Sequence, residues 1–298
     1  MSQHNFFIKL DLHCDVKIIC IESNDNEFLF FLKSLFYSHL FNVEGEFNVD
    51  VTVSAEFGLP LMDFTELSKS FNSARCGLLA SSSCDSTRLQ LFGLFKSKGL
   101  YKAAFREIRD HIDTFIINNN VMTLHASCVS DSRGAICVIG DKFAGKTTLM
   151  LKLLSVNYNF ISNDKPYIYK SEDKFYVFSL PVSAGIRYGS LDIFPYLKDS
   201  IQDRSSSDEV EFSTQGRVHL SPRIICDIFN TSYCNHSAIR KFIYLETNYK
   251  KDKSLLFSSE KLDENILSCK DLTLRDSFLD AEIKICSSYE EALSEAIC

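Results

Sequence analysis

Hydrophobic and polar residues alternate in the first part of the chain, as they do in β-strands that bury one face. The alternation covers FFIKLDLHCDVKIICI (residues 6–21) and FNVDVTVSAEF (47–57), and it predicts strands in both segments. Between them, Asp25 precedes the apolar run EFLFFLKSLFYSHL (27–40), which predicts a helix capped by Asp25. A longer helical pattern covers residues 89–118 and ends at consecutive asparagines, which suit a helix C-terminus.

After residue 120 the pattern changes to short strands around one helix. Continuous apolar character in AICVIG (135–140) predicts a strand buried on both faces, and KTTLMLKLLSV (146–156) predicts the helix that follows it. Three further segments complete the pattern: the strand VMTLHASCV (121–129), the strand NFISND (159–164) and a hairpin from Tyr167 to Val182. Strand, loop, helix and strand follow one another as in a βαβ unit, so this part is predicted to be an α/β fold with a parallel sheet.

The change of pattern divides the chain into two predicted domains. Residues 1–118 form a smaller α+β region, and residues 119–298 form an α/β domain. The first region is large enough for a docking or substrate-recognition role. Within the second, residues 199–216 are polar with few large apolar side chains, so a mobile loop is predicted there.

Net charge and cysteine content limit the expected partners and compartment. A net charge of −7 does not supply the basic surface that binds phosphate backbones, so no nucleic-acid partner is expected. No stretch approaches the roughly 18 apolar residues of a membrane span, so no membrane partner is expected either. The 11 cysteines include no CxxC pair, which favours reduced thiols in the core and a cytoplasmic location.

One segment carries a chemical motif. Residues 140–147 read GDKFAGKT and fit GxxxxGK[ST], the pattern of the phosphate-binding P-loop. Glycines allow a tight loop with inward-pointing N–H groups, and the helix after it directs its positive dipole end at the same place. Lys146 would reach the terminal phosphates, and the Thr147 hydroxyl would ligate Mg²⁺. The buried strand before the loop and the apolar helix after it favour a P-loop over an ordinary glycine turn. The residues expected to contact nucleotide are Gly140, Asp141, Lys142, Phe143, Ala144, Gly145, Lys146, Thr147 and Thr148.

Asp164 is the second candidate for chemistry. It lies 18 residues after Lys146, an interval that a helix, a turn and a strand fill, so it is expected at the carboxyl end of a strand beside the loop. A carboxylate there can hold Mg²⁺ or accept a proton from an attacking hydroxyl. The alternative is a turn aspartate before Lys165-Pro166. His125 lies on the strand before the loop, where spacing alone favours a packed core histidine.

These residues resemble the HPr kinase/phosphorylase superfamily, whose fold is shared with phosphoenolpyruvate carboxykinases. The chain looks closest to HPr-kinase-like proteins, including those encoded with modified-peptide biosynthesis genes. The resemblance covers residues 120–250 and runs through LHASCV (124–129), VIGDKFAGKTT (138–148), NFISNDKPYI (159–168) and LPVSAGIRYGSLDIF (180–194), and more weakly through VHLSPRIICDIF (218–229) and KFIYLE (241–246).

The resemblance implies an HPr-kinase/PEP-carboxykinase-like P-loop core in the C-terminal part of the chain. It implies ATP and Mg²⁺ as cofactors at Gly140–Thr148, with Lys146 and Asp164 as catalytic residues and His125 in support. Thr147 and Asp164 would ligate the metal, and family analogy adds a homo-oligomer.

Three departures from the family pattern bear on the substrate. Phe143 stands where the family usually has glycine, and Asn163-Asp164 replaces two consecutive aspartates. The Glu-x-Arg-Gly signature is absent, and residues 180–183 read LPVS instead. These differences argue against HPr as the phosphoryl acceptor.

Two functions are therefore predicted as alternatives. The first is a cytoplasmic ATP-dependent kinase that transfers the γ-phosphoryl group to a Ser/Thr-type hydroxyl of a protein or peptide, such as a modified-peptide precursor. The second is a nucleotide-binding interaction module that recruits a partner enzyme or peptide without phosphoryl transfer. Asn163 and the large N-terminal region favour the second. A GTPase is less favoured, because no guanine-reading motif follows Asp164.

Overall fold

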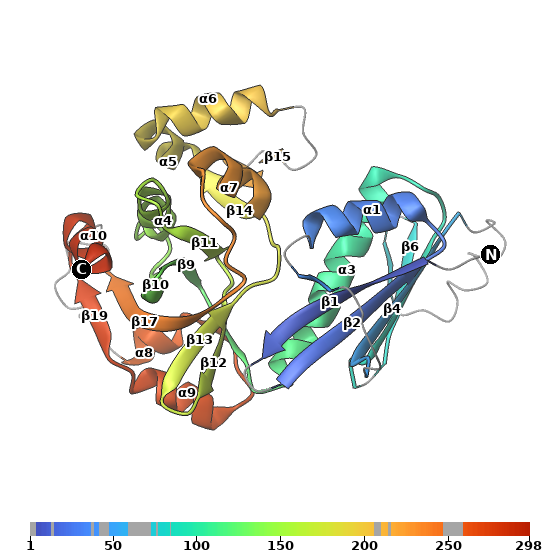
Figure 1. Ribbon diagram of the computed structural model, residues 1–298, viewed down its shortest axis with the longest axis horizontal. Helices are drawn as coiled ribbons and strands as arrows, with labels where there is room; N and C mark the ends of the chain where they lie inside the picture. The colour runs from blue at the N-terminus through green and yellow to red at the C-terminus, as the bar shows by residue number, and fades with distance from the viewer. Residues whose placement is uncertain are drawn as a thin grey trace. The chain divides into compact units, whose positions relative to one another are not determined.

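The protein is a mixed α/β chain with several sheets (Figure 1). Its computed structural model describes residues 4–12, 15–36, 39–41, 48–58, 73–75, 77–83, 85–205, 210–213, 216–246 and 259–298. The chain divides into two compact units, Met1–Asn119 and Asn120–Cys298.

A mixed sheet forms the first unit, with the described strands in the order β3-β1-β2-β4-β7-β6-β5. β1 and β2 pair as an antiparallel hairpin, whereas β2, β4 and β7 run parallel. The helices α1 and α3 contact each other and this sheet, so they cover one of its faces (Figure 1). The elements are β1 (His4–Leu12), β2 (Asp15–Ser23), α1 (Asn26–Leu35), β3 (Leu40–Phe41), β4 (Val51–Phe57), β5 (Ser73–Arg75), β6 (Leu78–Ser82), β7 (Arg88–Gly93) and α3 (Lys98–Ile117).

Local sequence signals explain β4 and the start of α1. The first, third, fifth and seventh residues of β4 are buried, as the alternating pattern predicts. Asp25 caps α1 as predicted, because its carboxylate accepts hydrogen bonds from the amides of Glu27 and Phe28.

The helix predicted over residues 89–118 is wrong in its first part. The segment begins with β7, in which Leu89 and Leu91 are buried and the residues beside them are not. This burial has the period of two of a strand, which the many apolar residues of the segment make hard to distinguish from a helical period. α3 begins only at Lys98. Ser97 is its N-cap, because the Ser97 hydroxyl accepts a hydrogen bond from the Leu100 amide.

A larger sheet organises the second unit, with the described strands in the order β11-β9-β10-β17-β13-β12-β8-β18, and β19 beside β17. A small second sheet has the order β14-β16-β15. The strands are β8 (Met122–Leu124), β9 (Ala126–Asp131), β10 (Gly134–Gly140), β11 (Asn159–Asn163), β12 (Tyr167–Ser171), β13 (Lys174–Phe178), β14 (Ala184–Arg187), β15 (Val210–Ser213), β16 (Arg217–Leu220), β17 (His236–Leu245), β18 (Ile266–Ser268) and β19 (Ile283–Cys286). The helices are α4 (Lys146–Leu154), α5 (Tyr188–Ile193), α6 (Pro195–Asp203), α7 (Pro222–Phe229), α8 (Ser259–Asp263), α9 (Leu272–Leu279) and α10 (Tyr289–Ile297).

The strand–loop–helix–strand order holds, but the predicted parallel pairing within it is wrong. β10 and β11 do not pair with each other, because β9 lies between them and is antiparallel to both. The parallel neighbour of β10 is instead β17, from much later in the chain. The predicted hairpin after Tyr167 is confirmed as the β12–β13 pair.

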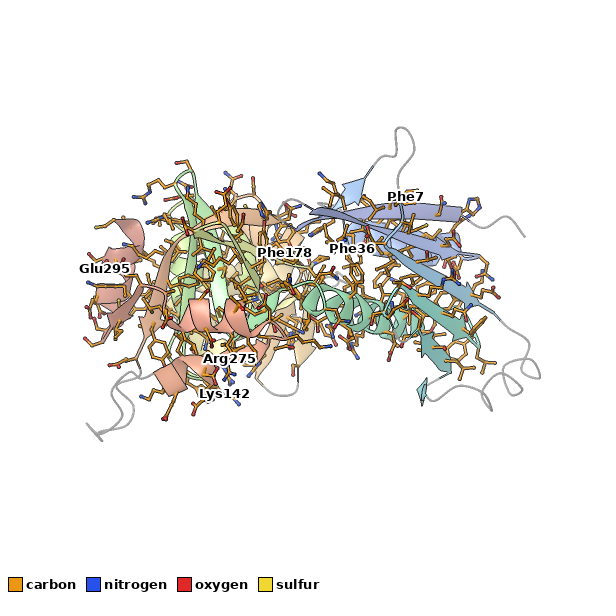
Figure 2. All side chains as sticks on the ribbon, turned by 90° about the horizontal axis from the view of Figure 1, so that it is seen from below. Phe7, Phe36, Lys142, Phe178, Arg275 and Glu295 are labelled. Atoms are coloured by element: carbon orange, nitrogen blue, oxygen red, sulfur yellow. The ribbon has the colours of Figure 1, made fainter. Side chains whose placement is uncertain are left out.

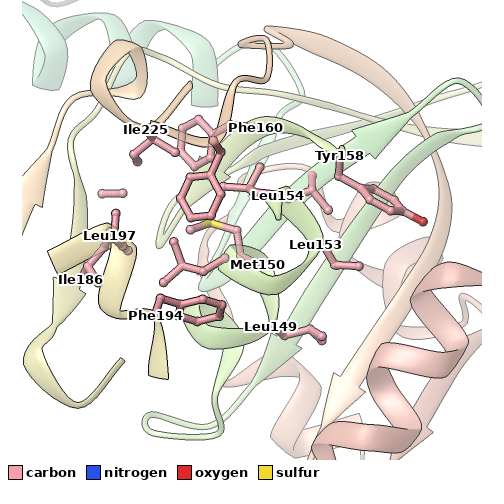
Figure 3. Close-up of a cluster of buried hydrophobic side chains, with 14 of the residues drawn as sticks. Leu149, Met150, Leu153, Leu154, Tyr158, Phe160, Ile186, Phe194, Leu197 and Ile225 are labelled. Atoms are coloured by element: carbon pink, nitrogen blue, oxygen red, sulfur yellow. The ribbon is translucent and has the colours of Figure 1, made fainter. Parts of the chain in front are cut away.

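Two apolar cores lie on the opposite faces of β10. Ile136 and Val138 belong to the core around α4 that Figure 3 shows, together with Leu149 and Phe160. Cys137 and its alternate neighbours belong to the other core. Burial on both faces, predicted from the continuous apolar run, is therefore confirmed.

Two further predictions need correction. The strand over residues 121–129 is interrupted at His125, whose amide donates to the Asn265 carbonyl oxygen at 2.7 Å instead of continuing the ladder. The loop predicted over residues 199–216 contains the end of α6 and the whole of β15, because the isolated apolar residues Ile201 and Val210 are buried. No helix in the described ranges has the length and apolar character needed to cross a bilayer.

Candidate functional site

The P-loop segment joins the carboxyl end of β10 to the first turn of α4. β10 ends at Gly140, and α4 begins at Lys146 after Gly145 in the N-cap position. The φ angles of Gly140 and Gly145 are 146° and 97°, values that residues with a side chain rarely adopt. A Cβ at Gly140 would also collide with the carbonyl oxygen of Leu245 on β17. The backbone therefore requires glycine at the start of the loop.

The first turn of α4 has no side-chain cap within the described residues, because its N-cap is a glycine. Its backbone N–H groups and the positive end of the helix dipole are therefore directed at the loop without a competing acceptor. This arrangement fits an anion such as a phosphate group.

Lys146 is the buried cation of the loop. Its side chain is 6% exposed, and its ammonium group donates to the carbonyl oxygens of Gly140 and Asp141 at 2.6 and 3.0 Å. Burial lowers the pKa of Lys146 to about 8, and the charges of Asp164 and Asp141 offset part of that shift. Two of the three N–H donors of the ammonium group are thus used within the loop, and the third can serve an anionic ligand.

Asn163 connects three elements at the edge of the site. Its Oδ1 accepts hydrogen bonds from the Ser127 hydroxyl of β9 at 2.7 Å and from the Thr147 hydroxyl of α4 at 3.1 Å. The hydrogen of Thr147 is thereby used, and its oxygen lone pairs stay available as a metal ligand. The Asn163 Nδ2 is buried and has no hydrogen-bond partner among the described residues. An oxygen of a ligand or a water molecule would satisfy that donor.

Asp164 follows β11 directly, with a φ of 73° that is unusual for a residue with a side chain. It is half-buried and lies near Lys146 and His125. Burial lowers the pKa of His125, the charge of Lys146 lowers it further, and Asp164 offsets part of the effect. His125 is therefore neutral at pH 7. Lys146, Asp164 and His125 lie close enough for the charges of the first two to change the pKa of the third.

Asp141 ties the start of the loop to a neighbouring strand. Its carboxylate accepts a hydrogen bond from the Tyr244 hydroxyl of β17 at 3.2 Å, and its carbonyl oxygen accepts one from the Ala144 amide at 3.1 Å. Burial raises the pKa of Tyr244, and the Asp141 charge raises it further, so the phenol keeps its proton and remains a donor.

Three other residues predicted to contact nucleotide are either exposed or hydrogen-bonded to a neighbouring helix. Lys142 and Phe143 are exposed, and Lys142 lies at the surface of its unit in Figure 2. The Thr148 hydroxyl lies 3.1 Å from the Ser190 hydroxyl of α5. Thr148 is therefore bound to a neighbouring helix, and Lys142 and Phe143 can meet a ligand only at the loop rim.

The two side-chain oxygen donors at the site fit Mg²⁺, which binds few protein ligands, better than a metal that is coordinated entirely by protein side chains. Thr147 and Asp164 are the predicted ligands, and the described residues include no group of three His, Cys, Asp or Glu side chains able to hold a metal. Mg²⁺ commonly takes one or two protein ligands and completes its shell with waters and substrate phosphates.

Ser127 and Tyr244 also belong to this region, although the motif did not predict them. The signal for Ser127 was present, since Ser127 lies two residues after His125 and both alternate with the buried Leu124, Ala126 and Cys128. The loop motif gives no comparable signal for Tyr244, because this residue lies on β17, far from the loop in sequence.

Neither a protein-family model nor a curated protein matches the chain. Among solved structures, it is similar to the HPr(Ser) kinase/phosphatase from Coxiella burnetii, with 12% identity and a TM-score of 0.27. That similarity covers 45% of this chain and 72% of the other. A likeness of this extent adds no weight to an assignment, which rests on the geometry of the loop.

Proposed function

We propose that this chain is an ATP-dependent kinase that transfers a phosphoryl group to a hydroxyl of a protein or peptide. The observation that supports this most strongly is the loop between β10 and α4. Its glycine conformations, uncapped helix terminus and buried Lys146 together suit a polyphosphate. Phosphoryl transfer requires mainly positioning and charge stabilisation, which this set of groups can supply.

Each residue has a distinct task in the proposed reaction. Lys146 and the amides of α4 bind the phosphates, and Thr147 and Asp164 hold Mg²⁺, which neutralises phosphate charge when bound. Asp164 takes the proton of the attacking hydroxyl. Neutral His125 stays near that carboxylate, where it can accept a hydrogen bond without adding a positive charge.

Transfer of labelled phosphate tests the proposal. We expect the purified protein with Mg²⁺ and γ-labelled ATP to phosphorylate members of a library of Ser- and Thr-containing peptides. Asp164→Asn should reduce transfer at least about 100-fold, because it removes the proton acceptor and one metal ligand, while nucleotide affinity changes much less, because Lys146 and the amides of α4 still bind the phosphates. Asp173→Asn, in the exposed turn between β12 and β13, is the matched control and should keep full transfer.

Asn163 supports a second candidate, a nucleotide-binding module without phosphoryl transfer. Its neutral amide leaves Asp164 as the one carboxylate of the Asn163-Asp164 pair at the end of β11. Saturable ATP binding with no labelled product from any peptide would contradict the kinase proposal and favour this alternative.

A further inference from the structure

Phe143 is the one residue of the loop with both a strained backbone and an exposed aromatic side chain. Its φ is 75°, in the left-handed region that a bulky residue rarely occupies. Its side chain is 66% exposed, so the ring gains little by burial. Neither local conformation nor packing into a core explains an aromatic residue at this position.

The Phe143 ring contacts a guanidinium group. The Arg187 guanidinium carbon lies 4.3 Å from the ring centroid, and the Lys142 ammonium lies 5.6 Å from it. Arg187 is the last residue of β14. Three residues later, Ser190 meets Thr148 in the first turn of α4. The junction of β14 and α5 is thus held against the P-loop segment at two points.

Arg187 also faces another arginine. It is paired with Arg217 in the register of β14 and β16, and like charges directly opposite one another destabilise a sheet. Arg217 and His219 lie across Gly185, where a Cβ would come within 3.8 and 3.2 Å of their side chains. Glu211 lies opposite His219 on β15. Within the described ranges neither arginine forms an ion pair with a carboxylate, so the pair has spare positive charge.

We propose that Arg187 binds the terminal phosphate of the nucleotide and that Phe143 is the positioning residue that holds it at the loop. The inference rests on the proposed nucleotide site. Stacking occupies the flat face of a guanidinium group and leaves the N–H groups on its edge to donate. Those donors match phosphate oxygens in two parallel hydrogen bonds. The ring belongs to the loop itself, so the guanidinium group stays at its rim.

Binding of Mg²⁺-ATP and Mg²⁺-ADP by full-length variants tests the inference, measured by calorimetry. Arg187→Gln should weaken ATP binding about tenfold or more, because it removes charged hydrogen bonds. ADP binding should change less than about twofold, since ADP lacks the phosphate that Arg187 contacts. Arg223→Gln, an exposed change on α7, is the matched control and should affect neither nucleotide.

Phe143 has its own pair of variants. Phe143→Gly should leave the melting temperature unchanged or higher, since glycine accepts a φ of 75°, yet it should weaken ATP binding several-fold. Phe143→Tyr keeps the ring and should keep the affinity. A merely structural Phe143 would instead show a lower melting temperature and an unchanged preference for ATP over ADP.

Two results would overturn this inference alone: ATP binding that survives Arg187→Gln, or an equal loss for ATP and ADP. Absence of ATP binding by the unsubstituted protein would overturn the proposed function as well.

Discussion

At the scale of single residues, Lys146 shows the cost of placing a charge in the loop. Its ammonium group is removed from water and is held by two carbonyl oxygens, at 2.6 and 3.0 Å. The neighbouring carboxylates offset the burial only in part, so the pKa stays at about 8. A buried charge of this kind lowers the stability of the folded state, and its retention suits a role in binding an anion.

We expect Lys146→Met to stabilise the protein without nucleotide at pH 7, by up to about 3 kcal/mol, because it replaces a buried ammonium group of lowered pKa with an unbranched apolar side chain of nearly the same length. Between pH 8 and 10.5 the unfolded chain holds the lysine proton more tightly than the folded chain, so wild-type stability rises with pH. The advantage of the variant should therefore shrink over that range. Urea unfolding at pH 7, 8, 9 and 10 measures it.

Lys152→Met on the same helix is the control for that experiment, because Lys152 is half-exposed. As a substitution of a solvent-accessible side chain, it should change the free energy of unfolding by no more than about 0.5 kcal/mol. A Lys146→Met protein that is less stable at pH 7, or whose advantage does not vary with pH, would contradict the burial of a charged ammonium group.

At the scale of elements, the site depends on how closely β10 and β17 approach each other. Gly140 pairs with Leu245 in the parallel register, and this contact leaves no room for a side chain at the end of β10. On the other side, β9 brings Ser127 against Asn163 of β11. The loop is therefore held between strands from three separate parts of the chain.

Gly140→Ala is expected to destabilise the second unit by about 1–3 kcal/mol, because the residue has a φ of 146° and its new Cβ meets the Leu245 carbonyl. It should also abolish most of the rise in melting temperature that ATP produces. Gly189→Ala in α5 is the matched control, since nothing lies within 4 Å of its Cβ position. Equal melting curves for the two variants would show that the loop conformation is not constrained in this way.

At the scale of the whole molecule, the candidate site belongs to one unit. His125, the loop, Asp164, Arg187 and Tyr244 all lie within Asn120–Cys298. Both apolar cores on the faces of β10 are also built from residues of that unit. Residues 1–119 contribute their own sheet, and their docking or substrate-recognition role stays a prediction.

A chain that begins at Asn120 is therefore expected to fold on its own and to bind ATP within about threefold of the full-length affinity, because it keeps its cores and all the proposed contacts. Cooperative thermal unfolding and calorimetric titration measure both properties. Loss of ATP binding by a folded chain of this kind would indicate that residues 1–119 complete the site.

The sequence by itself determined the features that depend on neighbouring residues. The Asp25 cap, the alternation in β4 and the doubly buried β10 follow from local hydrogen bonding and side-chain period. The P-loop pattern likewise predicted that Gly140 and Gly145 lie in a tight loop, because few other residue types adopt the backbone conformations that such a loop requires.

Only the tertiary structure decided which distant groups meet. β9 lies between β10 and β11, and β7 occupies the start of the segment 89–118 that was predicted to be helical. Asn163 contacts Thr147, and Arg187 contacts Phe143. Sheet order and contacts between elements depend on how whole apolar faces pack. Sequence period shows which face of a strand is buried, but not which strand lies beside it.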